Sequence, residues 1–220
     1  MSDQPFFRFD WVWSHGDDIV TRLGEHLELT LIAVLLGFTI AFPVSLYAYR
    51  HRRAYAPITW VAGILYTIPS LALFALLVPF TGLSTTTAEI GLVGYTLLIL
   101  IRNIVGGLDG VPEDAREAAR GMGYTPRQIL WKVEVPLAVP VIFAGVRIAT
   151  VTTIGLVTVT ALIGKGGFGF FILQGLSRFF STATILGAVL SIALAVLADR
   201  MLIAFERRLT PWSRARGSGV

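Results

Sequence analysis

Residues 109–136 read DGVPEDAREAARGMGYTPRQILWKVEVP and form the one long polar stretch between strongly apolar segments of the chain. The 220 residues are 55% hydrophobic and only 15% charged, whereas a soluble domain carries roughly 25% charged residues. Helices are the usual way for such a chain to cross a bilayer. The composition therefore predicts an all-α integral membrane protein in which residues 109–136 form a loop outside the bilayer.

Five apolar segments approach the roughly 20 residues that a helix needs to cross a ~30 Å hydrocarbon core. The glycine-rich segment 164–180 is a sixth candidate, but it contains Lys165, Gln174 and Arg178, so we predict a loop or a half-buried hairpin there. The five predicted spans are Leu27–Tyr49, Pro57–Phe80, Ala88–Val105, Ala138–Ile163 and Thr184–Phe205.

Basic residues predict the orientation, because cytoplasmic loops carry an excess of Lys and Arg. With the N-terminus outside and the C-terminus inside, the outer side holds only four of the 18 Lys and Arg residues: Arg8, Arg22, Lys165 and Arg178. The loop at 109–136 is then cytoplasmic.

This topology divides the chain into three parts. Residues 1–26 are rich in Phe and Trp, which favours an extracytoplasmic or interfacial segment over the alternative of a ligand-binding aromatic cage. Residues 27–206 form the transmembrane domain, and residues 207–220 form a cytoplasmic basic tail.

The first half of the polar stretch predicts a short helix. Pro112 suits a first helical turn, and acidic residues beside it face the positive end of the helix dipole. A left-handed glycine at Gly123 is expected to end the helix. Small apolar residues recur at helical spacing and predict one face that another backbone can approach closely. These residues are Ala115, Ala118, Ala119 and Met122.

The second half predicts another short helix, Pro126–Val133. Thr125 and Gln128 have the spacing of a capping box, and Pro126 stands at the first helical position. We expect Pro136 and Pro140 to end this helix and begin the fourth span. From these features alone, an ordinary cytoplasmic loop remains the alternative to a functional site.

A motif within this loop resembles that of a known family. The sequence EAA at 117–119, Gly123 ten residues before Val133, and VEVP at 133–136 are similar to the EAA loop of binding-protein-dependent ABC importer permeases. Val133 and Val135 replace Ile and Leu of that motif. Residues 66–79, 116–150 and 161–176 are similar to permeases of osmoprotectant importers for glycine betaine, choline or carnitine. Permeases for methionine and other small solutes share the plan of about five spans.

The resemblance implies a type I ABC importer permease, which is a transport subunit and not an enzyme. It implies a multi-pass protein of a bacterial inner membrane that works with a second permease subunit, identical or homologous, two cytoplasmic ATPase subunits and an extracytoplasmic solute-binding protein. ATP and Mg²⁺ would bind the ATPase, and this chain would hold no cofactor. The loop would be the coupling helix that docks on the ATPase through Ala115, Arg116, Glu117, Ala118, Ala119, Arg120, Met122, Gly123, Val133 and Pro136. Arg116, Arg120 and Arg127 are expected to form a charged rim, or else a solvated face.

Two groups inside the spans are candidates for further roles. Pro69 predicts a kink in the second span, so Tyr66, Thr67, Pro69 and Ser70 are expected to line the solute path, with a packing kink as the alternative. Charges inside a bilayer are costly. We therefore expect Arg147 and Asp199 to form a structural ion pair, with a gate as the alternative, and Arg102 either to join them or to reach the surface.

Several other functions are disfavoured. The chain has no cysteine, so it has no disulfide or Cys-based metal site, and we predict no metal site. Gly164, Gly166 and Gly169 match GxGxxG outside any βαβ context, and no P-loop sequence occurs. Nucleic acid is not expected as a partner despite the net charge of +4. A membrane scaffold or an electron-transfer subunit is the alternative of another class, but the three histidines are placed too far apart for a paired haem site.

Overall fold

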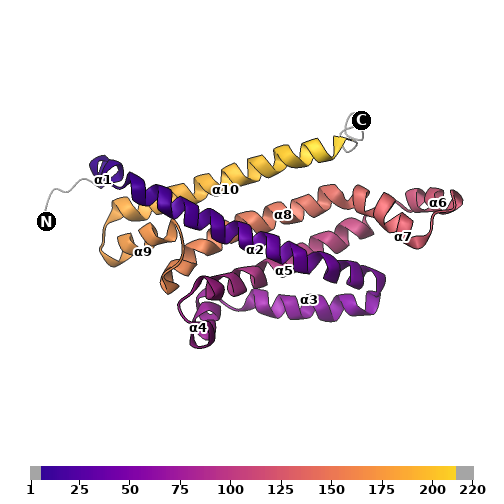
Figure 1. The fold of residues 1–220 in the computed structure, drawn as a ribbon, viewed down its shortest axis with the longest axis horizontal. Coiled ribbons are helices and arrows are strands. Elements are labelled where there is room, and N and C mark those ends of the chain that lie inside the picture. Colours follow the sequence, from indigo (N-terminus) through magenta and orange to yellow (C-terminus); the bar gives the residue numbers. More distant parts are fainter. Residues whose placement is uncertain (1–5, 212–220) are drawn as a thin grey trace.

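The computed structural model describes residues 6–211, and these residues form helices joined by short turns with no strand among them. The long helices lie side by side in an elongated bundle (Figure 1). The α-helices are α1 (Phe9–Ser14), α2 (Gly16–Arg50), α3 (Arg52–Thr67), α4 (Ser70–Thr81), α5 (Thr85–Asp109), α6 (Glu113–Gly121), α7 (Pro126–Ile129), α8 (Val135–Val157), α9 (Gly169–Ser177) and α10 (Ser181–Leu209).

Four helical segments within residues 6–211 are long and apolar enough to cross a membrane, and α3 with α4 supplies a fifth if the bent pair counts as one span. The prediction of an all-α protein with about five spans is therefore confirmed. The boundary expected between residues 26 and 27 falls inside α2, which already begins at Gly16. The four continuous segments are Gly16–Arg50, Thr85–Asp109, Pro126–Ile163 and Ser181–Leu209.

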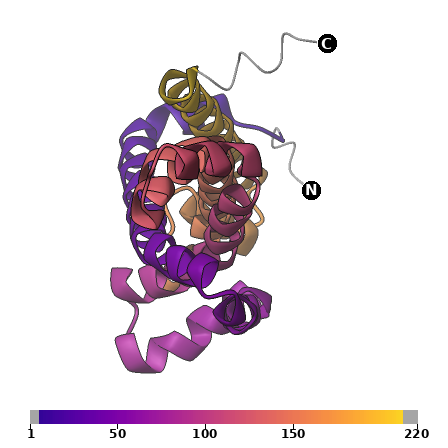
Figure 2. The same cartoon turned by 90° about the vertical axis from the view of Figure 1, so that its right-hand side faces the viewer.

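The second span differs from the single kinked helix that we predicted. The chain breaks between α3 and α4, whose axes meet at 93°, and Figure 2 shows α4 projecting sideways from the bundle. Ile68 adopts an extended backbone, with φ −64° and ψ 126°, because a residue that precedes proline avoids the helical region. The Tyr95 hydroxyl donates a hydrogen bond of 2.5 Å to the Ile68 carbonyl. The break thus leaves this carbonyl satisfied by a side chain.

The prediction that Pro136 and Pro140 end the second short helix is wrong. A π-helical turn, Leu130–Glu134, joins α7 directly to α8. In this turn the Val135 N–H bonds to the Leu130 carbonyl, five residues back. Proline removes one helical hydrogen bond and its ring crowds the carbonyl four residues earlier. The wider turn directly precedes Pro136, which lies in the first turn of α8, and the helix continues into the span.

Segment 164–180 is a tight glycine turn followed by α9, which packs against α10. Gly164 and Gly167 have positive φ angles of 77° and 48°, a conformation that favours glycine. The turn lies on the buried His26 of α2, and a Cβ at Gly167 would approach the His26 Cβ to 2.5 Å. The glycines therefore allow close approach of two backbones.

His26 ties three segments together from a fully buried position. Its Nε2 lies 3.1 Å from the Ile154 carbonyl, and its Nδ1 lies 3.3 Å from the Phe168 amide nitrogen. A carbonyl only accepts and an amide N–H only donates. The proton of His26 therefore sits on Nε2.

Helix α5 forms the centre of the bundle and packs mainly against α2 and α8. Small residues allow these contacts to be close. A Cβ at Gly37 of α2 would lie 2.0 Å from the Thr96 Oγ1, and one at Gly145 of α8 would lie 2.4 Å from the Asn103 Cβ. Close backbone approach at small residues is a usual basis of helix packing in membranes. The centre of the bundle is therefore set by contacts on α5.

Replacing His26 by Leu is expected to destabilise the protein by about 1–3 kcal/mol for each of the two backbone groups that lose their partner. The melting temperature of the purified protein in detergent measures this loss. His15→Leu is the control, because the His15 ring lies between α1 and α2 and, within residues 6–211, forms side-chain hydrogen bonds only with the nearby Trp11 and Ser14. Equal melting temperatures for the two variants would contradict the role of His26.

Candidate functional site

Helix α6 and helix α7 form a hairpin, residues 112–134, at the end of the bundle where α2, α5 and α10 also end (Figure 1). The helix α6 ends as its sequence predicts. Gly123 has φ 81°, the Gly123 N–H bonds to the Arg120 carbonyl, and the Tyr124 N–H bonds to the Ala119 carbonyl. These two bonds define a Schellman motif, which turns the chain back towards the membrane helices.

The start of α7 is the predicted capping box. The Thr125 hydroxyl accepts a bond from the Gln128 N–H, and the Gln128 side chain accepts one from the Thr125 N–H. Pro126 occupies the first turn, where its missing N–H has no cost. The hairpin is thus rigidly capped on both sides of Gly123.

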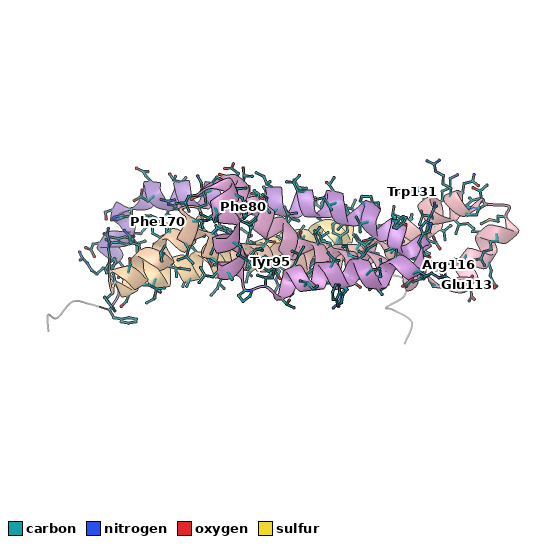
Figure 3. All side chains as sticks on the ribbon, turned by 90° about the horizontal axis from the view of Figure 1, so that it is seen from below. Phe80, Tyr95, Glu113, Arg116, Trp131 and Phe170 are labelled. Carbon is teal, nitrogen blue, oxygen red and sulfur yellow. The ribbon has the colours of Figure 1, made fainter. Side chains whose placement is uncertain are left out.

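Arg116 joins α6 to three membrane helices. Figure 3 shows Arg116 beside Glu113 at the hairpin end of the bundle. Its Nε donates to the Glu134 Oε1 over 2.8 Å, its Nη2 to the Leu108 carbonyl over 2.8 Å and to the Tyr49 hydroxyl over 3.1 Å, and its Nη1 to Glu113 over 3.0 Å. The Tyr49 hydroxyl also donates to Glu134, over 2.8 Å. We call this set of five residues the Arg116 cluster.

Burial and charge make this cluster strong. The side chains of Arg116 and Glu134 are only 13% and 10% exposed. Burial opposes the charge of Arg116, but bonds to Glu134 and Glu113 raise its pKa above the ordinary value. Hydrogen bonds from Arg116 and Arg120 lower the pKa of Glu113. Ionised groups that bond in this way make stronger hydrogen bonds than neutral ones.

The predicted small face of α6 is divided in two by the structure. Ala119 is 1% exposed and packs inward, Ala115 is half-buried, and Arg116 is held inside the cluster. The expectation that Arg116 belongs to an outer charged rim is therefore wrong. Its partners lie on other helices, and helical spacing within α6 could not reveal them.

The outer side of α6 is formed by other members of the predicted set. Glu117 and Ala118 are exposed, and Met122 is 65% exposed. Gly123 is exposed at the turn, while Val133 and Pro136 are half-buried where the hairpin meets α8. Arg120 is exposed and bonds to Glu113 over 2.8 Å. We call Glu117, Ala118, Gly121 and Met122 the outer face of α6.

Sequence reasoning missed Tyr49, Leu108 and Glu134. A lone glutamate between Lys132 and the apolar run of the fourth span was the available signal, because a buried carboxylate requires a partner. A second ion pair, between Arg52 and Asp109, joins the start of α3 to the end of α5. Both pairs anchor the helix ends beside the hairpin.

The residues predicted to line a path lie at the break between α3 and α4. Tyr66 and Thr67 line a groove of about 620 Å³ between α3 and α5, together with Arg102. Ser70 is the first residue of α4, and Pro69 is its N-cap. The Thr67 hydroxyl bonds to the Ile64 carbonyl within its own helix. The structure thus brings Tyr66 and Thr67 to one groove, whereas Pro69 and Ser70 are not among the residues that line it.

The predicted charge pair is present. The Arg147 Nε donates to the Asp199 Oδ1 over 2.9 Å, and the Arg147 Nη1 lies 3.9 Å from the Glu206 Oε2. Arg102 does not join this pair, since it lies in the groove between α3 and α5. Within residues 6–211 no three His, Cys, Asp or Glu side chains are grouped so that they could hold a metal ion.

Comparison with known proteins identifies the family. A family model described as "Binding-protein-dependent transport system inner membrane component" matches residues 33–211. The chain belongs to this family. It is an ABC importer permease subunit and a multi-pass protein of the bacterial cell membrane. Permeases of this kind work with ATPase and solute-binding partners.

Individual relatives are similar along most of the chain. The choline transport system permease protein OpuBB of Bacillus subtilis is 36% identical over 198 residues, which cover 90% of this chain and 91% of that protein. The osmoprotectant import permease protein OsmW of Salmonella typhimurium is 38% identical over 192 residues, 85% of this chain and 89% of that protein. An inward-facing structure of the MetNI methionine ABC transporter has a TM-score of 0.78 at 24% identity and covers 96% of this chain and 100% of that one. This similarity shows the type I permease fold.

Replacing Arg116 by Ala is expected to lower the free energy of unfolding by on the order of 3 kcal/mol, because it leaves the carboxylate of Glu134 buried without its cation. Arg120→Ala is the matched control: it removes the same charge from an exposed position on α6 and should cost less than about 1 kcal/mol. Thermal unfolding of the purified protein in detergent measures both. Similar losses in the two variants would contradict the Arg116 cluster as an anchor.

Proposed function

We propose that this permease imports an osmoprotectant with a quaternary ammonium group, such as glycine betaine, choline or carnitine. The observation that carries the proposal is the identity of 36–38% to permeases named for choline and osmoprotectant import, over 85–90% of this chain. A relative named as a glycine betaine/carnitine/choline permease, from Bacillus subtilis, is 35% identical. Methionine is the second candidate, since the chain shares the fold of the methionine transporter permease.

The hairpin at residues 112–134 is proposed to dock on a cytoplasmic ATPase subunit that binds ATP and Mg²⁺. This places the hairpin inside the cell, the N-terminus outside and the C-terminus inside. In support, the ends of α2, α5, α6 and α10 lie at one end of the bundle (Figure 1), and most basic residues belong to these ends. The outer face of α6 offers small and flexible side chains to a groove on the partner.

The Arg116 cluster supplies a mechanism for coupling. A force applied to α6 passes through hydrogen bonds to Tyr49 at the end of α2, Leu108 at the end of α5 and Glu134 before α8. A rigid link of this kind moves three helix ends together, which suits a two-state transition between arrangements of packed helices. Arg116 is therefore a positioning residue that transmits the movement of the docked helix.

The complete transporter is proposed to contain two permease subunits, identical or homologous, two ATPase subunits and one extracytoplasmic solute-binding protein. Alternating access requires two halves that rotate against each other. The groove that contains Tyr66 and Thr67 is proposed to face the path between these halves. Irregular backbone such as Ile68–Pro69 is tolerated inside a bilayer only where it is buried in protein or lines a water-filled cavity.

Uptake into proteoliposomes tests the proposed cargo. The complex of the permease with its ATPase and binding protein should accumulate radiolabelled glycine betaine, carnitine or choline when ATP is present on the side of the membrane that carries the ATPase. Accumulation should stop when the P-loop lysine of the ATPase is replaced. Transport of methionine with none of the three quaternary ammonium solutes would contradict the osmoprotectant proposal and favour the second candidate.

Replacing Ala118 by Arg is expected to reduce the amount of ATPase that co-purifies with the permease by about ten-fold or more, because a bulky charge cannot enter a close-packed interface. Ala118→Ser changes the same position by one small atom and should retain the ATPase. Quantitative blotting of affinity-purified complexes measures both ratios. Unchanged co-purification for Ala118→Arg would show that the outer face of α6 does not dock on the ATPase.

A further inference from the structure

A basic groove of about 440 Å³ lies beside the hairpin, between the end of α2 and the segment that joins α7 to α8. Two arginines line it, Arg50 at the last position of α2 and Arg127 in α7. His51 lies beside them. The remaining lining side chains are Leu46, Tyr47, Leu130 and Trp131.

The charge of this groove is not balanced within the described chain. Among the residues that the structure describes, no acidic side chain lines the groove. Across residues 6–211, no ion pair or side-chain hydrogen bond joins Arg50 or Arg127 to another residue, whereas Arg52, Arg116, Arg120 and Arg147 each bind a carboxylate. Two like charges that share a groove without a counter-charge repel each other. An anion that enters the groove relieves this repulsion.

The aromatic residues of the groove indicate its depth in the membrane. Trp131 is 48% exposed and Tyr47 is 55% exposed, and Figure 3 shows Trp131 at the same end of the bundle as Arg116 and Glu113. Trp and Tyr are enriched at the level of the lipid headgroups. The exposed ring of Tyr47 stacks on His51 with centroids 4.5 Å apart. The groove thus combines cations with an apolar, aromatic wall at the boundary between membrane and water.

We propose that this groove binds the phosphate of an anionic phospholipid headgroup, with Arg50 and Arg127 as its ligands and with Tyr47 and Trp131 beside the glycerol and upper acyl chain. Basic pockets between membrane helices on the cytoplasmic side are suited to lipid headgroups, and arginine binds phosphate through two parallel N–H bonds. An acidic surface on a protein partner would satisfy the charge but would not use the apolar wall.

The position of the groove gives the lipid an effect on the hairpin. Arg50 belongs to α2, whereas Arg127 and Trp131 belong to the segment 126–134. A bound headgroup therefore bridges a membrane helix and the hairpin on the side of the π turn, and it adds a second connection to that made by the Arg116 cluster. The bilayer would then stabilise the hairpin in the orientation that the structure shows.

The test compares lipid retention by the purified transporter complex. Native mass spectrometry after mild delipidation should show phosphatidylglycerol bound in preference to phosphatidylcholine. Arg50→Gln together with Arg127→Gln should weaken this retention by about thirty-fold, the factor given by two charges that contribute about 1 kcal/mol each. The control pair is Arg53→Gln with Arg200→Gln, which removes the same charge from exposed positions outside the groove and should leave retention unchanged.

Thermal unfolding of the same complexes in nanodiscs separates the possible anions. Phosphatidylglycerol should raise the melting temperature of the natural protein above that in phosphatidylcholine, and the Arg50, Arg127 double variant should lose this increase. If inorganic phosphate stabilises the protein to the same extent in phosphatidylcholine nanodiscs, the ligand of the groove is a free anion and not a lipid. Loss of ATPase co-purification by the Arg50, Arg127 double variant, with its phosphatidylglycerol retention unchanged, would assign the arginines to the ATPase interface. Either result, or equal retention in the two double variants, overturns the proposal.

Discussion

The close packing of α5 against α2 and α8 is the constraint on which the rest of the bundle depends. Glycines at 37 and 145 face Thr96 and Asn103 of α5, and no larger residue fits at either contact. Apolar side chains gain little from leaving lipid for protein, so helices in membranes associate through such close contacts. Because α5 ends at Asp109 beside the hairpin, its position also fixes where α6 begins. The packing of one central helix thus places the site at the end of the bundle.

Charge adds a second level of order at this end. Arg116 and Glu134 are both nearly buried, and each is satisfied by groups from another helix. Breaking a pair of this kind leaves an uncompensated charge, so the cluster behaves as a unit. The ion pair of Arg52 with Asp109 joins α3 to the same region. The end of the bundle that carries the hairpin is therefore connected to four of the membrane helices.

Local sequence signals predicted the hairpin well but not its partners. Capping chemistry acts within a few residues, so Thr125, Gln128 and Gly123 were sufficient to place both helix ends. The direction in which α6 faces depends on Tyr49 and Leu108, which are distant in sequence and gave no periodic signal. Composition likewise predicts the spans. The sequence predicts a kink at Pro69 and a helix end at Pro136, whereas the structure has a break at Pro69 and a continuous helix through Pro136. The difference lies in tertiary contacts: Tyr95 satisfies the open carbonyl at Ile68, and a π turn accommodates Pro136.

The π turn at Leu130–Glu134 has a consequence for how the family can vary. It contains one residue more than an α-helical turn requires. Removing one residue from this segment would turn α7 by about 100° relative to α8 and shift it by about 1.5 Å. Arg127 would then no longer face α2. Glu134 would keep its position relative to α8 only if the deleted residue came before it in the sequence. A length change here would redirect the outer face of α6 without altering any residue on it, so the number of residues in this turn sets the angle between the membrane helices and the proposed docking surface.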